Sequence, residues 1–404
     1  MFKEHRRESI FKFIRKNHRT TVNVLSTVFK VTKETIRSDL RYLEEKGVIR
    51  RFYGGAYIFQ QAHQQILSGK NQLTELMRNV DMKYSNAVSN QNDKGMKSKV
   101  CILGSFNVDI VARVSHFPRS GETVRAIANT FGPGGKGCNQ AMAAWLANAD
   151  MHFFTKVGND YFSEFARNHF MSAGMDSYTL YQTDDASTGS AVIYVAEEEG
   201  GENMIAISPG ANQTINEREI EALQPYLVES DILLVQLENN IDAVTSAIKL
   251  AHSLGNTVIL NPAPYSNEII PALSYVDIIT PNETEASLLS GIEVVDMESA
   301  KQAATKIAEM GIKHVLITLG SRGVLLLDDD VFHHIPAFPA VVVDTTGAGD
   351  AFNGSLAAAL ANGYSLLNAV RYATAFASLA VEREGAANMP NDEMTKQRLA
   401  TIWC

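Results

Sequence analysis

The chain has 404 residues, of which 45% are hydrophobic and 20% are charged, a composition typical of globular domains. A chain of this length is too long for one ordinary core and predicts two or more domains. Apolar runs stay well short of the roughly 20 residues that span a bilayer, and a signal peptide is not apparent, so we expect a cytoplasmic protein without membrane contact. Cysteines stand only at positions 101, 138 and 404, widely spaced and odd in number, which argues against disulfides and a structural zinc site.

The formal net charge of −9 is unevenly distributed along the chain. Residues 1–60 contain 14 Lys and Arg against 6 Asp and Glu, a local charge of +8, so the rest of the chain carries −17. A small basic head on a large acidic body indicates a nucleic-acid-binding appendage. Charge alone leaves a merely solvated basic surface as an equal alternative.

The basic head shows three helical patterns followed by a short β wing. Apolar residues at helical spacing predict a first helix over about residues 3–17, and residues 21–26 open a second. The third spans 32–45, with Thr32 as N-cap, Thr35 at the neighbouring capping-box position, and Gly47 as the C-terminal stop. One face of this helix is apolar and the opposite face is basic, and residues 48–56 form the wing.

The segments 31–40, 44–47 and 54–56 together resemble the DeoR-type winged helix-turn-helix. The resemblance implies a third helix in the major groove of an operator and a homodimer that reads two half-sites. The residues placed for DNA contact are Lys33, Thr35, Arg37, Arg41, Arg50 and Arg51. Ser38 stands where the family commonly has a second arginine. The alternative is a small helical interaction module that does not touch DNA.

We expect a flexible linker at 61–98, where Gln, Asn, Ser and Lys predominate, and an α/β body at 99–404. Buried-strand runs alternate with helical stretches in the body, which predicts a layered fold around a mainly parallel sheet. These runs are 100–105, 232–237, 257–260, 276–280 and 314–319. Shorter strand patterns at 110–130, 190–196 and 203–207 predict a separate antiparallel sub-sheet.

A glycine-rich motif occupies residues 132–140, Gly-Pro-Gly-Gly-Lys-Gly-Cys-Asn-Gln. It contains G-x-G-x-x-G, but it does not follow the first buried strand of the body, and Pro133 sits inside the turn, so a dinucleotide fold is disfavoured. A Walker A motif is excluded because a glycine follows Lys136. The glycines allow the backbone to approach a small ligand, and Lys136 and Asn139 supply donors.

A second motif occupies residues 344–350, Asp-Thr-Thr-Gly-Ala-Gly-Asp, between an apolar run at 341–343 and good helix formers at 355–361. The order predicts a strand, a glycine turn and a helix. Small residues leave backbone N–H groups open to an anion at the helix N-terminus, and Asp350 follows in the first turn. A base beside an anion hole suits phosphoryl transfer to a hydroxyl. The alternative is a turn with two acidic caps.

Both motifs resemble signatures of the ribokinase (PfkB) family, and the resemblance extends over roughly residues 99–395. It implies a ribokinase-like layered α/β/α domain with a small β lid over the sugar. Asp350 is then the base, and Gly347, Ala348 and Gly349 form the anion hole. The sugar is bound by Asn107, Val108, Asp109, Gly135, Lys136, Gly137, Cys138, Asn139, Glu238 and Asp350. Without the family, the Asn-x-Asp at 107–109 is more often a turn and Glu238 an ordinary loop acid.

The resemblance also implies ATP as the phosphoryl donor, with Mg²⁺ and an activating K⁺. The ATP-binding positions are Asn282, Thr318, Leu319, Gly320, Ser321, Arg322, Gly323, Gly349, Asp350 and Thr374. The resemblance implies that Glu285 contacts Mg²⁺ through water. Asn282 and Glu285 also have the spacing of a cap at the N-terminus of a helix. The K⁺ positions are Asp344, Thr346, Ala380, Arg383 and Gly385, and Met389 stands where the family has a serine.

The expected activity is ATP-dependent phosphorylation of D-ribose, or a closely related pentose, at its 5-hydroxyl, with a head that regulates transcription. One alternative is a transcriptional regulator that uses the kinase fold mainly as a sugar sensor. Another is a kinase for deoxyribose or a nucleoside.

Overall fold

The computed structural model describes residues 6–7, 10–11, 13–14, 19–45, 49–52, 55–58, 99–199 and 202–400. The chain divides into two compact units, one built on Met1–Met96 and the other on Lys97–His252 with Asn256–Cys404. The expected linker, the stop at Gly47 and Cys404 lie outside the described residues. Within the described ranges, none of the helices has the length and apolar character that a bilayer-spanning segment needs.

The head has the helices that the sequence predicts. Its described residues between Arg6 and Ile14 are helical, and α2 (Val22–Phe29) and α3 (Lys33–Glu45) follow. Thr21 caps α2 by accepting from the Val24 N–H, and Thr32 caps α3 by accepting from the Thr35 N–H, both at 3.2 Å. The apolar sides of the three helices form one buried cluster that includes Ile10, Ile14, Leu25, Ile36, Leu40 and Leu43.

The wing is an antiparallel pair, β2 (Ile49–Phe52) and β3 (Gly55–Ile58), as expected. A third strand that the sequence pattern did not show, β1 (Arg19–Thr21), pairs with β3 and completes the sheet. The basic side chains Lys33, Arg37 and Arg41 are exposed on α3, opposite its buried residues.

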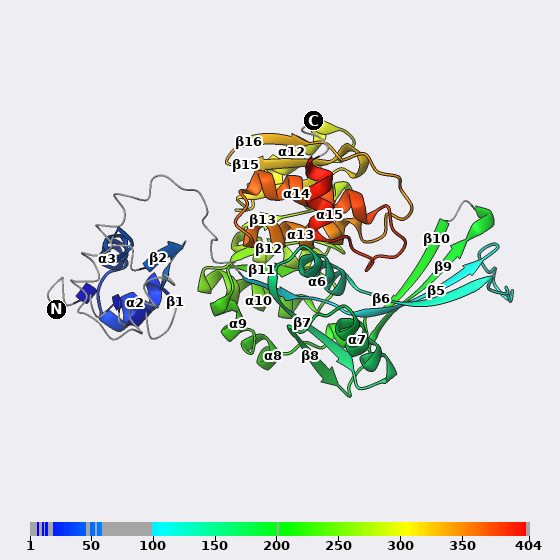
Figure 1. The fold of residues 1–404 in the computed structure, drawn as a ribbon, viewed down its shortest axis with the longest axis horizontal. Helices are drawn as coiled ribbons and strands as arrows, with labels where there is room; N and C mark the ends of the chain where they lie inside the picture. Colours follow the sequence, from blue (N-terminus) through cyan, green and yellow to red (C-terminus); the bar gives the residue numbers. More distant parts are fainter. Residues whose placement is uncertain are drawn as a thin grey trace. The chain divides into compact units, whose positions relative to one another are not determined.

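The body is built on a nine-stranded sheet whose strands run parallel except at one edge (Figure 1). In spatial order they are β16 (Val331–Ile335), β15 (Val324–Asp328), β14 (His314–Thr318), β13 (Ile278–Ile279), β12 (Thr257–Leu260), β11 (Ile232–Val235), β4 (Lys99–Leu103), β7 (Asp150–Gly158) and β8 (Tyr178–Thr183). The pairs β14–β15 and β15–β16 are antiparallel. The predicted parallel runs are therefore confirmed, and the continuous apolar run of β11 is buried because helices cover both faces of the sheet.

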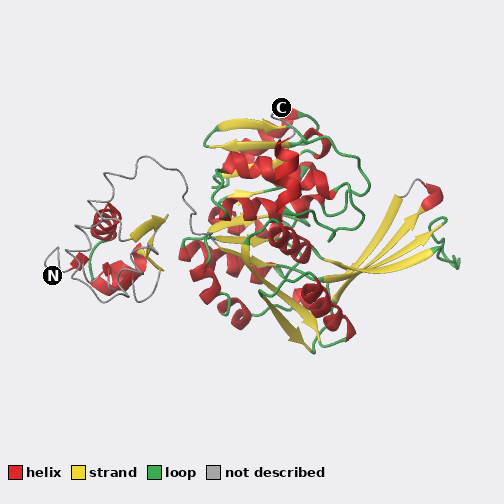
Figure 2. Ribbon diagram, viewed as in Figure 1, coloured by secondary structure: helices red, strands yellow, loops and turns green. Residues whose placement is uncertain are grey.

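Figure 2 shows helices on both sides of the body's strands. On one face α6 (Lys136–Leu146), α13 (Ala348–Ala361) and α14 (Leu366–Ala380) share a single core with the sheet. The remaining helices of the body are α7 (Tyr161–Ser172), α8 (Glu217–Glu221), α9 (Gln224–Glu229), α10 (Ile241–Leu254), α11 (Glu283–Ser290), α12 (Met297–Ala308) and α15 (Asp392–Ala400). The packing of α6 against α13 brings the two sequence motifs together, although they lie some 200 residues apart.

A second sheet of four strands projects from the body: β10 (Glu202–Ser208), β9 (Gly189–Ala196), β5 (Asn107–Val114) and β6 (Ala128–Gly134), in that order (Figure 1). The prediction of a wholly antiparallel sub-sheet is wrong at its centre, because β5 and β9 run parallel. The reason is topological. The chain leaves this sheet after β6, crosses the body through β7 and β8, and re-enters beside β5 in the same direction.

The strand predicted at 341–343 is also wrong. Val341, Val342 and Val343 are 78%, 62% and 61% exposed and belong to an irregular segment. The Val343 N–H donates to the Val381 carbonyl at the end of α14, and not to a neighbouring strand. An apolar run forms a strand only where an open sheet edge can receive it, and this segment instead passes beside a cavity.

Candidate active site

Asp350 lies in the first turn of α13, as the motif predicts, and is 6% exposed. The helix is preceded by Gly347, whose φ of 78° is in the left-handed region. A Cβ at this position would lie 2.7 Å from the Ala386 carbonyl oxygen, so the turn requires glycine. The Ala348 N–H donates to the Thr345 carbonyl at 3.2 Å, so this predicted anion-hole donor is used by the turn itself.

Both carboxylate oxygens of Asp350 accept hydrogen bonds from consecutive amides of α6. Asn139 Nδ2 donates to Oδ2 at 3.0 Å, and Gln140 Nε2 donates to Oδ1 at 2.9 Å. Gln140 also donates to Asn261 Oδ1 at 3.1 Å and accepts from Gln236 Nε2 at 2.7 Å. The Asp350 carboxylate is thus held in one orientation by a chain of buried amides. Gln140 stands inside the glycine motif, but its role was not predicted, because its partner Asp350 lies 210 positions away in the chain.

Lys136 begins α6 and faces the same carboxylate. Burial favours a lower pKa for its ammonium, but the charges of Asp350, Glu238 and Glu285 outweigh burial and raise that pKa. The Lys136 backbone N–H donates to Glu238 Oε2 at 2.9 Å, and Ser105 Oγ donates to the same oxygen at 2.5 Å. The predicted sugar-site residues Lys136 and Glu238 therefore lie near the Asp350 carboxylate, and the ammonium of Lys136 is charged.

Asn107 and Asp109 lie two residues apart on β5, so their side chains point to the same side of the strand. Burial, followed by the negative charges of Glu238 and Asp350, raises the pKa of Asp109 from 3.8 to about 6. A Cβ on Gly134 would lie less than 2.5 Å from the Asp109 carboxylate, so the glycine of the opposing strand makes room for it. By contrast, Val108 and Cys138 are fully buried, and only their backbones are available to a ligand.

Two cavities meet at the N-terminus of α13. The smaller, of about 180 Å³, is lined by Lys136, Glu285, Gly347, Gly349 and Asp350, among others. The larger, of about 800 Å³, lies between the β14–β15 turn and α14. Both cavities share the wall formed by Asn282, Thr318, Thr345, Ala348 and Gly349. A ligand with a large planar part and an anionic chain fits such a pair.

Most of the predicted ATP positions line the larger cavity: Asn282, Thr318, Gly320, Ser321, Gly323, Gly349 and Thr374. Two do not. Leu319 is buried in the core, and Arg322 forms an ion pair with Glu283 and donates to the Val295 carbonyl at 3.0 Å. The irregular segment that replaces the predicted strand contributes Phe338, Pro339 and Val342 to this cavity, a contribution that the sequence analysis missed.

The predicted K⁺ positions come together where the loop before α13 meets the loop after α14. Asp344 Oδ1 accepts from the Thr346 N–H at 2.8 Å, and Oδ2 accepts from the Gly385 N–H at 3.0 Å. Burial alone raises the pKa of Asp344, but these donors and Arg113 lower it below its ordinary value. The Asp344 N–H also donates to the Val381 carbonyl at 3.2 Å, so the Asp344 segment is bonded to the loop after α14. Met389, which replaces a serine, contributes its carbonyl to Arg383 at 3.2 Å.

Glu285 and Asn282 form a reciprocal capping box at the start of α11, as the cap reading predicts. Glu285 is buried, and burial raises the pKa of its carboxyl. Within the described part of the chain, no cluster of three His, Cys, Asp or Glu side chains suits a metal ion. A Mg²⁺ ion here would depend on oxygens of the nucleotide and of water.

A helix N-terminus with a buried carboxylate in its first turn, a nearby charged lysine and two joined cavities suit an enzyme that moves a phosphoryl group to a hydroxyl. Residues 97–394 match the model of the pfkB family carbohydrate kinases, and residues 6–62 match the DeoR-like helix-turn-helix domain. The chain therefore belongs to the pfkB family of carbohydrate kinases, and its body is an ATP-dependent sugar kinase.

Relatives match the chain over about three quarters of its length. The ribokinase of Staphylococcus aureus is 39% identical over 75% of this chain and 100% of its own length. The deoxyribokinase of Salmonella typhi is 32% identical over 74% and 98%. The structure of Arabidopsis thaliana ribokinase complexed with ribose and ATP superposes with a TM-score of 0.68, at 31% identity over 75% of this chain and 99% of that one.

Proposed function

We propose that the body phosphorylates the 5-hydroxyl of D-ribose with ATP. The observation that carries this proposal is the position of Asp350, whose carboxylate is held by two amides at the mouth of the smaller cavity. Asn107, Asp109 and Glu238 supply a donor and acceptors for several hydroxyls, which favours a sugar rich in free hydroxyl groups. The identity to ribokinases is higher than to deoxyribokinase, which supports ribose over deoxyribose.

In the proposed mechanism, Asp350 accepts the proton of the 5-hydroxyl as its oxygen bonds to the γ-phosphorus. The bond between that phosphorus and the oxygen shared with the β-phosphate breaks, and ADP leaves. Backbone N–H groups of Gly347 and Gly349, with the Lys136 ammonium, stabilise the charge on the transferred group. Asp350 then releases its proton to solvent.

The residues present fit both predicted cations. Mg²⁺ would be held through Glu285 and the nucleotide, and it supplies charge neutralisation at the phosphates. K⁺ would be held by Asp344 and the carbonyls of Thr346, Ala380, Arg383 and Gly385. A cation held by these residues would stabilise the turn before α13, which carries the proposed anion site.

The proposal is tested by ADP release from the full chain with Mg·ATP, over ribose, deoxyribose, fructose and nucleosides, with and without K⁺. We expect the highest kcat/KM with ribose and a stimulation by K⁺. A preference for deoxyribose or for a nucleoside would change the assigned substrate but would still support kinase activity. An absence of ADP release with every acceptor would reject the activity and favour the sensor alternative.

We further propose that the head binds operator DNA as part of a homodimer. The exposed Lys33, Arg37 and Arg41 on α3 favour this function, since a basic helix face opposite a buried one suits a major groove. Footprinting with the full chain at low salt, with and without ribose and ATP, tests it. Arg41→Ala should weaken the footprint and Lys396→Ala in the body should not, while a full chain without any footprint would reject DNA binding.

A further inference from the structure

A buried asparagine outside both motifs, Asn212, contacts the backbone and side chain next to the proposed sugar site. It lies in the short turn Gly210–Gln213 that follows β10, and it is 1% exposed. Its Oδ1 accepts from the Phe106 N–H at 3.0 Å, and its Nδ2 donates to the Phe106 carbonyl at 3.0 Å. The amide can take only this orientation, because a flip would place a donor against a donor and an acceptor against an acceptor.

The second hydrogen of Asn212 Nδ2 points to Asn107 Oδ1, at 2.8 Å. Asn107 must therefore turn its oxygen toward Asn212 and its own Nδ2 away from it. In the described ranges of the chain, no acceptor is bonded to that Nδ2. The backbone N–H and carbonyl of Phe106 thus fix the orientation of Asn212, and Asn212 in turn fixes that of Asn107. Asn107 is left with a hydrogen-bond donor next to the Asp109 acceptor.

The space around this contact is closed by a glycine. Gly189, at the start of β9 in the four-stranded sheet, pairs with Asn107. A Cβ there would lie 2.2 Å from Asn107 Oδ1 and 2.4 Å from Asn212 Nδ2. A side chain at position 189 would push the two amides apart, so their hydrogen bond requires glycine at this position of β9.

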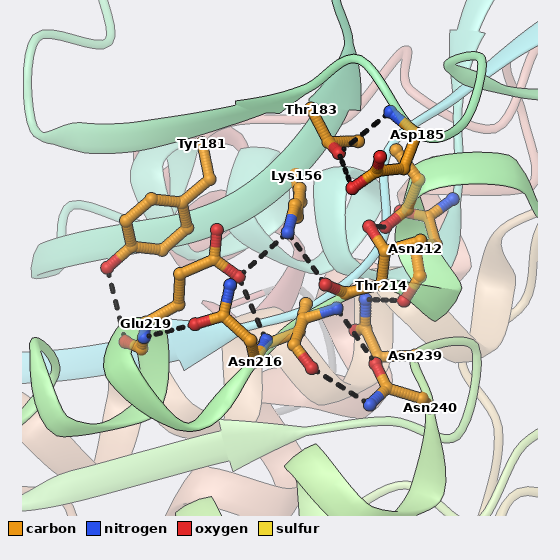
Figure 3. Close-up of polar contacts among 12 residues, drawn as sticks. Lys156, Tyr181, Thr183, Asp185, Asn212, Thr214, Asn216, Glu219, Asn239 and Asn240 are labelled. Carbon is orange, nitrogen blue, oxygen red and sulfur yellow. Dashed lines mark hydrogen bonds and ion pairs between the residues drawn. The ribbon is translucent and has the colours of Figure 1, made fainter.

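Hydrogen bonds from Lys156, Asn239 and Asn240 hold the turn that carries Asn212 and the residues just after it, as Figure 3 shows. The buried Lys156 donates to the Thr214 carbonyl at 2.7 Å and to Glu219 at 3.0 Å. Asn240 bonds both the N–H and the carbonyl of Ile215, and Asn239 donates to the Asn212 carbonyl at 3.1 Å. The turn is therefore held to the segment that follows Glu238, the other proposed sugar contact.

We infer that Asn212 is a positioning residue that sets the sugar specificity of this site by fixing Asn107 as a donor toward a sugar hydroxyl. The inference rests on the proposed function. It predicts an effect on the sugar alone, because Asn212 contacts Asn107 and does not line the larger cavity, where most of the predicted ATP positions lie.

The test compares KM for ribose, KM for ATP and kcat in three full-length variants. Asn212→Asp can no longer donate to Asn107, and it should raise KM for ribose roughly tenfold or more, with KM for ATP unchanged. The matched control is Asn256→Asp, a buried asparagine that donates to the Leu227 and Ser230 carbonyls elsewhere in the body, and it should leave KM for ribose unchanged.

A second variant covers the case in which Asn212→Asp does not fold. Asn107→Asp keeps every contact of Asn212 with Phe106 but places an acceptor where the inference requires a donor, so KM for ribose should rise as well. A KM for ribose that stays normal in either folded variant overturns the inference. So does a KM for ribose that rises equally in Asn256→Asp. Neither outcome contradicts the kinase activity. A wild-type chain without ribose-dependent ADP release would instead refute the proposed function and this inference together.

Discussion

Replacing Asp109 by asparagine should make the body more stable and a poorer sugar binder at the same time. Burial and the charges of Glu238 and Asp350 raise the Asp109 pKa from 3.8 to about 6. This difference corresponds to at most about 3 kcal/mol of unfavourable free energy for the ionised carboxylate in the folded protein. Asp109→Asn removes the charge and should gain up to that amount of unfolding free energy near pH 8.

The sign of the pH dependence follows from the direction of the shift. Between pH 3.8 and about 6 the folded wild-type protein binds a proton at Asp109 that the unfolded chain does not, so its stability increases as the pH falls through this range. The advantage of the asparagine variant should therefore be largest above pH 7 and vanish near pH 4. The wild-type KM for ribose should rise below about pH 6, because the protonated carboxyl loses an acceptor.

Urea unfolding at pH 4.5, 6 and 8 measures this, with fluorescence of Trp145 as a probe of the body. Asp176→Asn is the matched control, since Asp176 is exposed and its replacement should leave the stability unchanged at each pH. A stability of Asp109→Asn that parallels wild type at all three pH values would refute the electrostatic reasoning. It would mean that the carboxylate is solvated in the free protein.

Three further changes probe other parts of the chain. Asp350→Asn should lower kcat by about 10²–10⁴ while ribose binding, measured by calorimetry, stays within a fewfold of wild type. Gln140→Glu replaces a donor to Asp350 by a second carboxylate and should move the acid limb of the kcat/KM profile upward by about one pH unit or more; an unmoved limb contradicts the positioning role. Asp39→Ala removes the buried partner of Arg6 and Arg7 and should destabilise the head by about 3 kcal/mol. Hydrogen exchange in α3 measures that loss, and Glu34→Ala, at an exposed pair with Arg37, should have little effect.

Local patterns in the sequence predict the elements that depend on neighbours along the chain. The cap at Thr32, the helix that starts after Gly347 and the capping box of Asn282 with Glu285 all involve partners within a few residues. Such partners are visible in a linear sequence because helical spacing fixes which residues meet. The two glycine motifs could likewise be recognised from their local sequence, and the structure brings them together.

The features that the sequence analysis missed depend on partners far away in the chain. Val341–Val343 has strand-forming residues, but no sheet edge receives it. The parallel pairing of β5 with β9 follows from the excursion of the chain through β7 and β8. Gln140 bonds Asp350 across 210 positions, and Asn212 bonds Phe106 across 106. A buried amide has no periodicity of its own, so its role becomes visible only when its partners are known.

Two buried amides serve the same physical purpose on the two sides of this site. Gln140 holds an acceptor, the Asp350 carboxylate, and Asn212 holds a donor, the Asn107 amide. A carboxamide suits both tasks because it carries a donor and an acceptor on one rigid plane, so satisfying one end dictates what the other end presents. Water in either place could reorient and would leave the polarity of the site undefined. The preorganisation of the site therefore resides in neutral amides, which a search for charged residues passes over.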